Sequence, residues 1–496
     1  METLEAYRDI LVEIGKLSSA QSLLGWDQQT HMPANGSPVR AEVLGKLSRL
    51  EFELSTCDAL GQYIEELEGR EDLTDEEAAS VRDVGRKYRR EKAIPPTVFE
   101  AFTVARSKGQ AAWAEARASA DFERFRPHLV QLVDFARRFA EYYGYEERPY
   151  DALLEPFEPA MTSRRLEEII DPLKAELVPF LKRLQSDGTP PNASVLSGSY
   201  PIDRQRDLSR RTLELIGYDF ASGTLDDAPH PFTSEIAFGD VRVTNRYEKN
   251  DPVSGLFGAL HEGGHALYGQ GMGESLYRLQ LSNGASFGMH ESQSRLLENQ
   301  IGRGRPFWQF FQPILGEFIP RLADVDSEAI YRAVNLVSPS LIRVEADEVT
   351  YNFHIMLRFE LESALINGAI RVDELPTLWN DAMARYIGVV PKNDADGVLQ
   401  DVHWSMGAFG YFPSYMLGNL YAAQLSTALR ADRPDLDKEI AAGEFEPLVT
   451  WLREKVHRFG GVYRAEDLIQ RITGEGLDSK HFVAYVVDKF SDIYGL

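Results

Sequence analysis

The chain has 496 residues, 43% of them hydrophobic and 26% charged, and a formal net charge of −24 at pH 7. This is the composition of a globular protein with a large core, and it excludes a chain that is disordered throughout. The excess of acidic groups repels phosphate backbones and anionic lipid head groups. We therefore expect neither nucleic acid nor a membrane as a partner.

Cys57 is the only cysteine, so no disulfide can form within the chain. This is typical of proteins from reducing compartments. The sequence starts with charged residues and contains no apolar run long enough to span a bilayer. We predict a cytoplasmic protein.

Helical periodicity dominates the sequence. The first helix face, at spacings of three and four, consists of Leu4, Tyr7, Leu11, Ile14 and Leu17. Residues 74–77 have the form of a capping box that opens another helix. Residues 186–200 collect Gly, Pro, Ser and Asn. We interpret this loop as a surface connection, and not as a domain boundary, because helical patterning resumes at residue 203.

One region departs from the helical pattern. Apolar and polar residues alternate across residues 235–246, on both sides of the pair Gly239-Asp240. Two short alternating runs around such a pair predict a β-hairpin. After residue 254 helical patterning continues to the end of the chain. The sequence therefore predicts a mainly α fold with one small antiparallel sheet.

The residues His261-Glu262-Gly263-Gly264-His265 form an H-E-x-x-H pattern. Residues four apart share one face of a helix, so both imidazoles can bind a single ion, while the glutamate can reach a water bound to that ion. Imidazole and carboxylate ligands suit Zn²⁺, and a catalytic site leaves its fourth position to water. The alternative is a pair of histidines on the surface of an ordinary helix.

The two glycines of the pattern argue against that alternative. A glycine in a helix interior costs about 1 kcal/mol relative to alanine. Close approach by another element or by substrate would explain why Gly263 and Gly264 are there.

A zinc site needs a third protein ligand. A third histidine six residues after His265 is absent, because Gly271 occupies that place. Glu291, Glu298 and Glu274 are the candidates, and spacing alone favours Glu291 only weakly.

These residues resemble the carboxypeptidase Taq family of metallocarboxypeptidases, and the resemblance runs almost from end to end. The motifs that carry it, in the order of the family, are Gly25-Trp26-Asp27, His230-Pro231-Phe232, Asp240-Val241-Arg242-Val243-Thr244, the H-E-x-x-H pattern, His290-Glu291-Ser292, Ile342-Arg343-Val344-Glu345-Ala346-Asp347, and Gly397-Val398-Leu399-Gln400-Asp401-Val402-His403-Trp404. No motif position departs from the pattern.

The resemblance implies a large helical fold in which residues 1–496 form one catalytic domain. It also implies a deep active-site groove with a small sheet beside it, and a homodimer. The implied activity is the removal of C-terminal residues from peptides with broad specificity. It assigns His261, His265 and Glu291 as ligands of one Zn²⁺ and Glu262 as the catalytic carboxylate. Co²⁺ or Mn²⁺ are possible substitutes.

Peptide hydrolysis also needs neutral donors for the oxyanion. His403, Tyr415 and Tyr411 are the candidates, and we favour Tyr415 over Tyr411. Each of them could instead be a core side chain with a satisfied polar group. Asp401 could orient a histidine.

An exopeptidase must also bind a free carboxylate, which the planar fork of arginine does best. Arg343 is the favoured candidate and Arg242 the other, although either could pair with an acid such as Asp347. His230 is a further candidate for the substrate end of the site. An exposed strand edge, probed by Thr244→Pro, could hold an extended peptide.

Three alternatives remain for the function. The same site could serve an endopeptidase or oligopeptidase, which would also cleave an amidated peptide. The chain could be a helical protein that binds metal without catalysis, or a scaffold without metal. Metal content and peptide hydrolysis separate these possibilities.

Overall fold

The computed structural model describes residues 2–496. Each of its two compact units is assembled from three segments of the chain. The first unit consists of Met1–Glu91, Asn192–Val334 and Ala422–Gly476, and the second of Lys92–Pro191, Asn335–Tyr421 and Leu477–Leu496. Because the segments alternate along the chain, no single cut separates the units.

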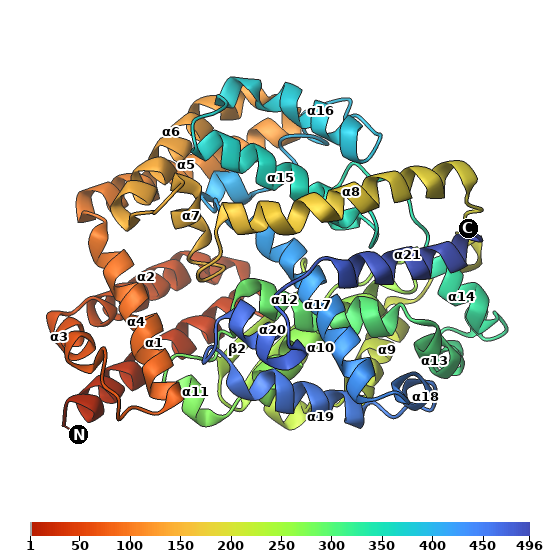
Figure 1. Ribbon diagram of the computed structural model, residues 1–496, viewed down its shortest axis with the longest axis horizontal. Coiled ribbons are helices and arrows are strands. Elements are labelled where there is room, and N and C mark those ends of the chain that lie inside the picture. The colour runs from red at the N-terminus through yellow and green to blue at the C-terminus, as the bar shows by residue number, and fades with distance from the viewer. Residues whose placement is uncertain (1) are drawn as a thin grey trace. The chain divides into compact units, whose positions relative to one another are not determined.

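The first unit consists of helices and one small three-stranded sheet, of which Figure 1 labels β2. Its helices are α1 (Glu2–Thr30), η1 (Ala34–Gly36), α2 (Ser37–Ser55), α3 (Asp58–Leu67), α4 (Asp75–Ala93), η2 (Ala193–Leu196), α9 (Ile202–Leu215), η3 (Phe220–Ser222), α10 (Ser254–Gly271), α11 (Glu274–Arg278), α12 (Phe287–Arg295), η4 (Leu296–Gly302), α13 (Arg305–Phe318), η5 (Pro320–Leu322), α14 (Ser327–Val334), α18 (Leu436–Ala441), α19 (Glu446–Lys455), η9 (His457–Phe459) and α20 (Ala465–Thr473).

The second unit is described by helices alone. They are α5 (Pro96–Ser119), α6 (Phe122–Tyr143), α7 (Pro149–Leu154), α8 (Ser163–Asp187), η6 (Arg343–Glu345), α15 (Tyr351–Ile366), η7 (Val372–Glu374), α16 (Leu375–Tyr386), η8 (His403–Met406) and α21 (Lys480–Tyr494). The long helix α17 (Phe412–Asp432) passes from the second unit into the first.

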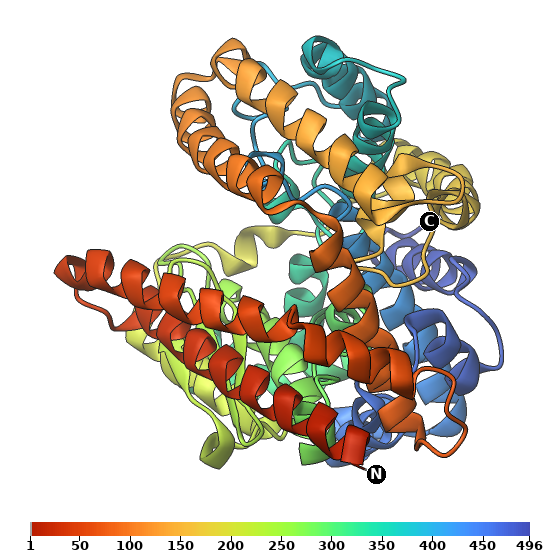
Figure 2. The same cartoon turned by 90° about the vertical axis from the view of Figure 1, so that its left-hand side faces the viewer.

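The N-terminal helices confirm the predicted face and cap. Tyr7, Leu11 and Ile14 are buried in one cluster with residues of α3 and α4. Figure 2 shows α1 and α2 side by side as two long red helices. At the start of α4 the backbone N–H of Thr74 donates to the carboxylate of Glu77 (2.7 Å), and the N–H of Glu77 donates to Thr74 Oγ1 (3.3 Å). This is the predicted capping box.

The predicted hairpin is confirmed, and a further strand joins it. β2 (Thr233–Ala237) and β3 (Asp240–Asn245) pair antiparallel around Gly239, whose φ is 81°. β1 (Leu225–Asp227) adds a parallel pairing to β3, so the order is β1-β3-β2 and the sheet is mixed, not antiparallel throughout. A three-residue strand is too short to show as an alternating run.

The expectation for Thr244 is wrong. Thr244 lies in the central strand and donates its N–H to Phe232 (2.9 Å), so it is not part of an exposed edge. The loop at residues 186–200 contains the passage from one unit to the other, between Pro191 and Asn192. No helix among residues 2–496 is both long and apolar enough to cross a membrane.

The glycines of α10 allow close packing, as predicted. A Cβ at Gly264 would lie 2.4 Å from the carbonyl oxygen of Gln293 and 2.6 Å from the Cα of Ser294 in α12. A Cβ at Gly263 would meet the side chains of Leu213 and Ile216, at the end of α9. The backbones of α10 and α12 therefore approach more closely than any other residue at position 264 permits.

The last segment of the first unit contacts the same two helices. His457 is fully buried, and a Cβ at Gly271 would lie 2.6 Å from its ring. Its Nε2 lies 3.0 Å from Oε1 of Gln293 in α12. One side chain near the end of the chain thus touches both α10 and α12.

Gly264→Ala should destabilise the metal-free protein by about 1–3 kcal/mol, because the added methyl overlaps backbone that cannot rotate away. Urea unfolding of metal-free protein measures this. The control is Gly45→Ala in α2, where a Cβ meets nothing within 4 Å. It should stabilise the protein by up to about 1 kcal/mol. Equal effects of the two substitutions would contradict the packing argument.

Candidate metal centre

Helix α10 carries the two histidines. Oδ1 of Asp251 accepts the N–H groups of Val253 and Ser254 (3.0 Å each), which satisfies donors that a helix start leaves free. His261 and His265 then project from one face, with ring centroids 5.0 Å apart.

Helix α12 brings a carboxylate to both rings. Oε2 of Glu291 lies 3.7 Å from Nε2 of His261 and 3.4 Å from Nε2 of His265. One ligand atom from each of the three residues lies within 4.8 Å of the others. The other glutamates are placed elsewhere, because Glu274 pairs with Arg278 and Glu298 contacts the opposite nitrogen of His261.

The donor set fits a divalent cation. Nδ1 of His261 lies 2.9 Å from Oε2 of Glu298, and Nδ1 of His265 lies 2.7 Å from Nδ1 of His290. With both Nδ1 atoms engaged, the Nε2 lone pairs are left to bind a metal. Two imidazoles and one carboxylate are the ligands of many catalytic zinc sites.

A charged network surrounds these ligands. Nε of Arg295 donates to Oε1 of Glu291 (2.7 Å), and its Nη1 donates to Oε2 of Glu298 (3.2 Å). Burial lowers the pKa of His261, but the two glutamates outweigh burial and raise it to about 9, so a binding cation must displace a proton from Nε2. Burial raises the pKa of Glu291, yet Arg295 and His261 hold it well below the ordinary value. Glu291 is therefore ionised and able to bind a cation.

Glu262 lies beside the ligands, with 5% of its surface exposed. The hydroxyl of Thr233 in β2 donates to its Oε2 (2.8 Å) and also lies 2.9 Å from its carbonyl oxygen. Burial raises the pKa of the Glu262 carboxyl. A positioned carboxylate with a raised pKa is suited to acid–base chemistry.

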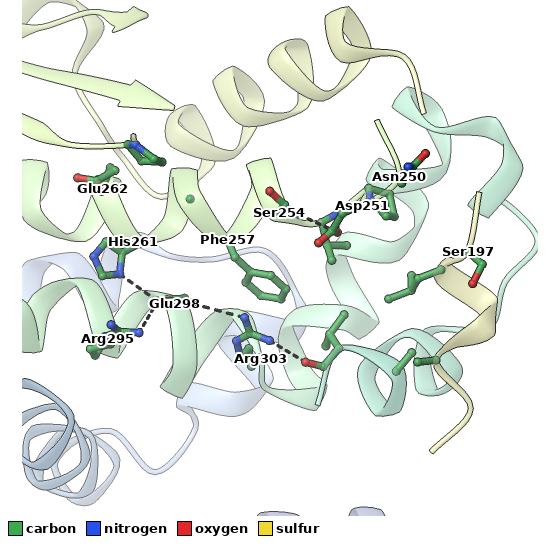
Figure 3. A pocket seen from close by; sticks show the side chains of 18 residues that line it. Ser197, Asn250, Asp251, Ser254, Phe257, His261, Glu262, Arg295, Glu298 and Arg303 are labelled. Atoms are coloured by element: carbon green, nitrogen blue, oxygen red, sulfur yellow. Dashed lines mark hydrogen bonds and ion pairs between the residues drawn. The ribbon is translucent and has the colours of Figure 1, made fainter. Parts of the chain in front are cut away.

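A cavity of about 690 Å³ in the first unit adjoins the cluster. Figure 3 shows it extending from His261 and Glu262 along α10 to Ser254 at the start of the helix. The guanidinium of Arg303 lies over the ring of Phe257 in its wall, 3.8 Å from the centroid.

The second unit contains Arg343, the favoured carboxylate-binding residue. Its Nε and Nη2 donate to Oδ1 of Asp401 (3.0 and 2.9 Å). Arg358, fully buried, donates to Oδ2 of the same carboxylate (2.7 and 2.5 Å). The alternative of a pair with an acid is therefore seen for Arg343, but the acid is Asp401. Asp347 instead accepts from the backbone of residues 338, 349 and 350.

His403 and the two tyrosines also lie together in the second unit. Nε2 of His403 is 3.3 Å from the hydroxyl of Tyr415, and its ring centroid is 5.4 Å from that of Tyr411. Burial lowers the pKa of His403 to about 4, so the ring is neutral near pH 7. Asp401 lies 3.9 Å from Nδ1 of His403, and its close partners are the two arginines.

The remaining predicted residues belong to the first unit. Arg242 pairs with both carboxylate oxygens of Asp240 (2.7 and 2.8 Å) and lies over the ring of Trp26, 4.5 Å from the centroid. This contact joins two of the sequence motifs. His230 is exposed in the loop between β1 and β2.

Glu362 in α15 accepts three hydrogen bonds although it is fully buried. The donors are the hydroxyl of Tyr150 (2.8 Å), Nε1 of Trp404 (2.6 Å) and the N–H of Gly410 (2.6 Å). Trp404 adjoins His403 and Gly410 adjoins Tyr411, so this carboxylate binds the Trp404 side chain and the Gly410 backbone next to the aromatic group.

The sequence-based predictions did not include Thr233, Arg295, Arg358 and Glu362 as parts of these clusters. Two features of the sequence could have indicated some of them. Arg295 follows Glu291 by four residues, the spacing of a helical ion pair. Arg358 and Glu362 are charged residues in a helix whose other positions are mostly apolar, and buried charges need partners.

Comparison with known proteins covers the whole chain. The model of the carboxypeptidase Taq (M32) metallopeptidase family matches residues 6–490. Carboxypeptidase 1 of Bacillus subtilis is 42% identical over 488 residues, which cover 98% of this chain and 97% of the relative. Thermostable carboxypeptidase 1 of Thermus thermophilus is 40% identical over 505 residues, 99% of both chains. The crystal structure of the M32 carboxypeptidase from Deinococcus radiodurans matches with a TM-score of 0.97, at 35% identity over 100% of both chains.

The helical fold and the His-His-Glu cluster are those of an H-E-x-x-H metallopeptidase. The chain belongs to the carboxypeptidase Taq (M32) metallopeptidase family and is a metallocarboxypeptidase.

Glu362 should make stability depend on pH. Burial raises its pKa from 4.5 to about 7. The folded state therefore keeps a proton that the unfolded state has released. The contribution to stability is complete below about pH 4.5 and is lost as the pH rises through 7. Glu362→Gln removes this titration, so the free energy of unfolding of the wild type should fall by up to about 3 kcal/mol relative to the variant between pH 5 and 8.

Urea unfolding of both proteins across this range is the measurement. The free energy of unfolding of Glu362→Gln should be lower than that of the wild type at pH 5, because the new amide nitrogen faces the N–H of Trp404. The comparison therefore uses the change of the free energy of unfolding with pH and not its absolute value. Glu123→Gln, at an exposed position of α6, is the control and should keep the wild-type slope. If the free energy of unfolding changed with pH equally in the wild type and in Glu362→Gln, the raised pKa of Glu362 would be refuted.

Proposed function

We propose that the protein removes single residues from the free C-terminus of peptides with broad specificity, using a zinc ion and Glu262 as general base. The observation that carries this proposal is the convergence of Nε2 of His261, Nε2 of His265 and Oε2 of Glu291 beside a buried carboxylate. Broad specificity and zinc rest on the resemblance to the family. One Zn²⁺ per chain is proposed, with Co²⁺ or Mn²⁺ as substitutes.

His261, His265 and Glu291 would hold the cation. A divalent cation so bound lowers the pKa of water and polarises a carbonyl group. Thr233 donates to Oε2 of Glu262, which leaves Oε1 to take the proton of the attacking water and to deliver it to the leaving nitrogen. Burial excludes bulk water from this carboxylate and keeps its pKa raised, which favours both transfers.

The residues of the second unit are assigned to substrate binding and to the oxyanion. His403 is neutral and lies beside the hydroxyl of Tyr415, so either group can donate without carrying a charge. Arg343 and Arg358 together exceed the charge of Asp401 by one positive unit. A free C-terminal carboxylate would balance this excess, and we assign it to Arg343. Tyr411, Arg242 and His230 remain candidates for smaller contributions.

Three further properties are part of this proposal. The single cysteine favours a reducing, cytoplasmic location. The resemblance to the family favours a homodimer. We also propose that residues 1–496 function as one catalytic domain, since the alternating segments leave neither unit as a continuous piece of chain.

An endopeptidase or oligopeptidase using the same cluster is the alternative function. A protein that binds metal without catalysis is disfavoured, because Glu262 and its Thr233 partner are both in place.

Glu262→Gln should retain one metal ion per chain and lower kcat by about three orders of magnitude, because the amide cannot take a proton from water. Turnover of an unblocked peptide and elemental analysis of the same preparation measure both quantities. The control is Glu274→Gln at an exposed ion pair of α11, which should change neither. A kcat for Glu262→Gln near that of the wild type would remove Glu262 as the base.

Peptides with a free C-terminus should be hydrolysed, and the same peptides with a C-terminal amide should resist. Arg343→Met should lower kcat/KM for the free peptide by about a hundredfold, because a charged hydrogen bond contributes about 1.5–3 kcal/mol. Arg242→Met is the matched variant, since Arg242 pairs with Asp240 in the first unit. Cleavage of amidated peptides at equal rates favours the endopeptidase, and a loss confined to Arg242→Met transfers the role to that arginine.

A further inference from the structure

A chain of hydrogen bonds leads from His265 away from the proposed cation. Nδ1 of His265 lies 2.7 Å from Nδ1 of His290, and Nε2 of His290 lies 2.9 Å from Oε1 of Glu235. The hydroxyl of Tyr277 donates to Oε2 of Glu235 (3.3 Å) and to the carbonyl oxygen of Gly269 (3.1 Å). The chain thus joins α10, α12, β2 and α11.

Metal ligation by His265 would fix the positions of the protons along this chain. A ligating Nε2 of His265 carries no proton, so Nδ1 carries it and donates to Nδ1 of His290. That atom is then an acceptor, so the proton of His290 is on Nε2 and is donated to Glu235. The carboxylate accepts at both oxygens, from His290 and from Tyr277. In this arrangement each donor meets an acceptor, and His265 presents an unprotonated Nε2.

The two histidine ligands differ in how they reach a carboxylate. Nδ1 of His261 contacts Glu298 directly, and Glu298 is also paired with Arg295 and Arg303. His265 reaches Glu235 only through a second imidazole. Glu235 has no arginine or lysine partner in the part of the chain that the structure describes, residues 2–496. The partners of its carboxylate are His290 and Tyr277.

The local sequence places Glu235 for this contact. Thr233 and Glu235 are two residues apart in β2, so their side chains project from the same face of the strand. The first reaches Glu262 and the second reaches His290, so one strand supports two residues of the metal centre. A Cβ at Gly269 would lie 2.9 Å from the carboxyl carbon of Glu235, so glycine there leaves room for the carboxylate against α10.

We propose that Glu235 is a positioning residue for the metal centre: through His290 it holds His265 in the tautomer and ring orientation that present Nε2 to the cation. Carboxylate partners of ligating histidines typically contribute 10–100-fold to metal affinity. Glu235 is not one of the three proposed ligands, and its carboxylate contacts His290 and Tyr277. The inference rests on the proposed function only in that the cluster binds a metal.

The test is the dissociation constant of Zn²⁺, measured on the metal-free full-length protein in competition with a chromogenic chelator. Glu235→Ala should raise this constant by about 10–100-fold. Glu235→Gln keeps an oxygen for the N–H of His290 and should raise it less. His290→Asn keeps an acceptor near Nδ1 of His265 but breaks the link to position 235. In that background Glu235→Ala should cause no further loss.

Glu77→Gln is the control, because Glu77 is a buried glutamate of the same unit that binds Thr74 and Arg8 instead. It should lower thermal stability without changing the Zn²⁺ dissociation constant. An unchanged constant in Glu235→Ala overturns the proposal. So does an equal loss from Glu235→Ala in the wild-type and His290→Asn backgrounds, since the effect would then not pass through His290.

The outcome is separable from that of the proposed function. If the wild-type protein binds Zn²⁺ tightly and Glu235→Ala binds it equally well, the positioning role fails and the metallocarboxypeptidase mechanism stands. If the wild-type protein binds no divalent cation, the proposed mechanism fails. As a second measurement, the hyperfine-shifted Nδ1–H resonance of His265 in Co²⁺-loaded protein should move in Glu235→Gln, while that of His261 stays in place.

Discussion

The metal centre depends on hydrogen bonds to the backs of two imidazole rings. A histidine binds a cation only through a nitrogen without a proton, and the partner of the other nitrogen decides which one that is. Glu298 determines which nitrogen of His261 lacks the proton, and His290 determines which nitrogen of His265 lacks it. Buried ionised groups are costly unless they are paired and hydrogen-bonded. Glu291 and Glu298 are stabilised here by Arg295, which contacts both. The two imidazole rings, the two carboxylates and Arg295 therefore depend on one another. Removal of any one of them leaves another buried group without a partner.

Backbone packing makes this arrangement possible. Residue 264 has no side chain, so α12 lies against α10 closely enough for Glu291 to reach both rings. The π-helical segment η4 (Leu296–Gly302) follows α12 directly and carries Glu298 to the opposite nitrogen of His261. Wide helical turns of this kind are frequent at functional sites. The strand β2 then lies beside α10 and supplies Thr233 to Glu262. Helices α10 and α12, the segment η4 and strand β2 thus supply a ligand set, a base and their supports.

The sequence predicted the helical class, the hairpin, the capping box and the His-Glu-His part of the site, because each depends on residues close together along the chain. The third ligand could not be chosen by spacing, since Glu274, Glu291 and Glu298 all lie at plausible distances and only the packing of α12 on α10 distinguishes them. The pairing of Arg343 with Asp401, and not with Asp347, is equally non-local. Strand β1 was missed because three residues show no periodicity. The supports from Thr233 and Glu235 were missed because the sheet approaches α10 from a different part of the chain.

The alternation of segments has a consequence for how the protein is made. All residues assigned to the cation lie between positions 261 and 291, so they leave the ribosome together. His457, which touches both metal-bearing helices, belongs to the last segment of the first unit and follows more than 160 residues later. At about 5–20 residues per second, this interval lasts roughly 8–30 seconds. During this interval α10 and α12 lack their contact with His457. A protein truncated before residue 457 would never form this contact.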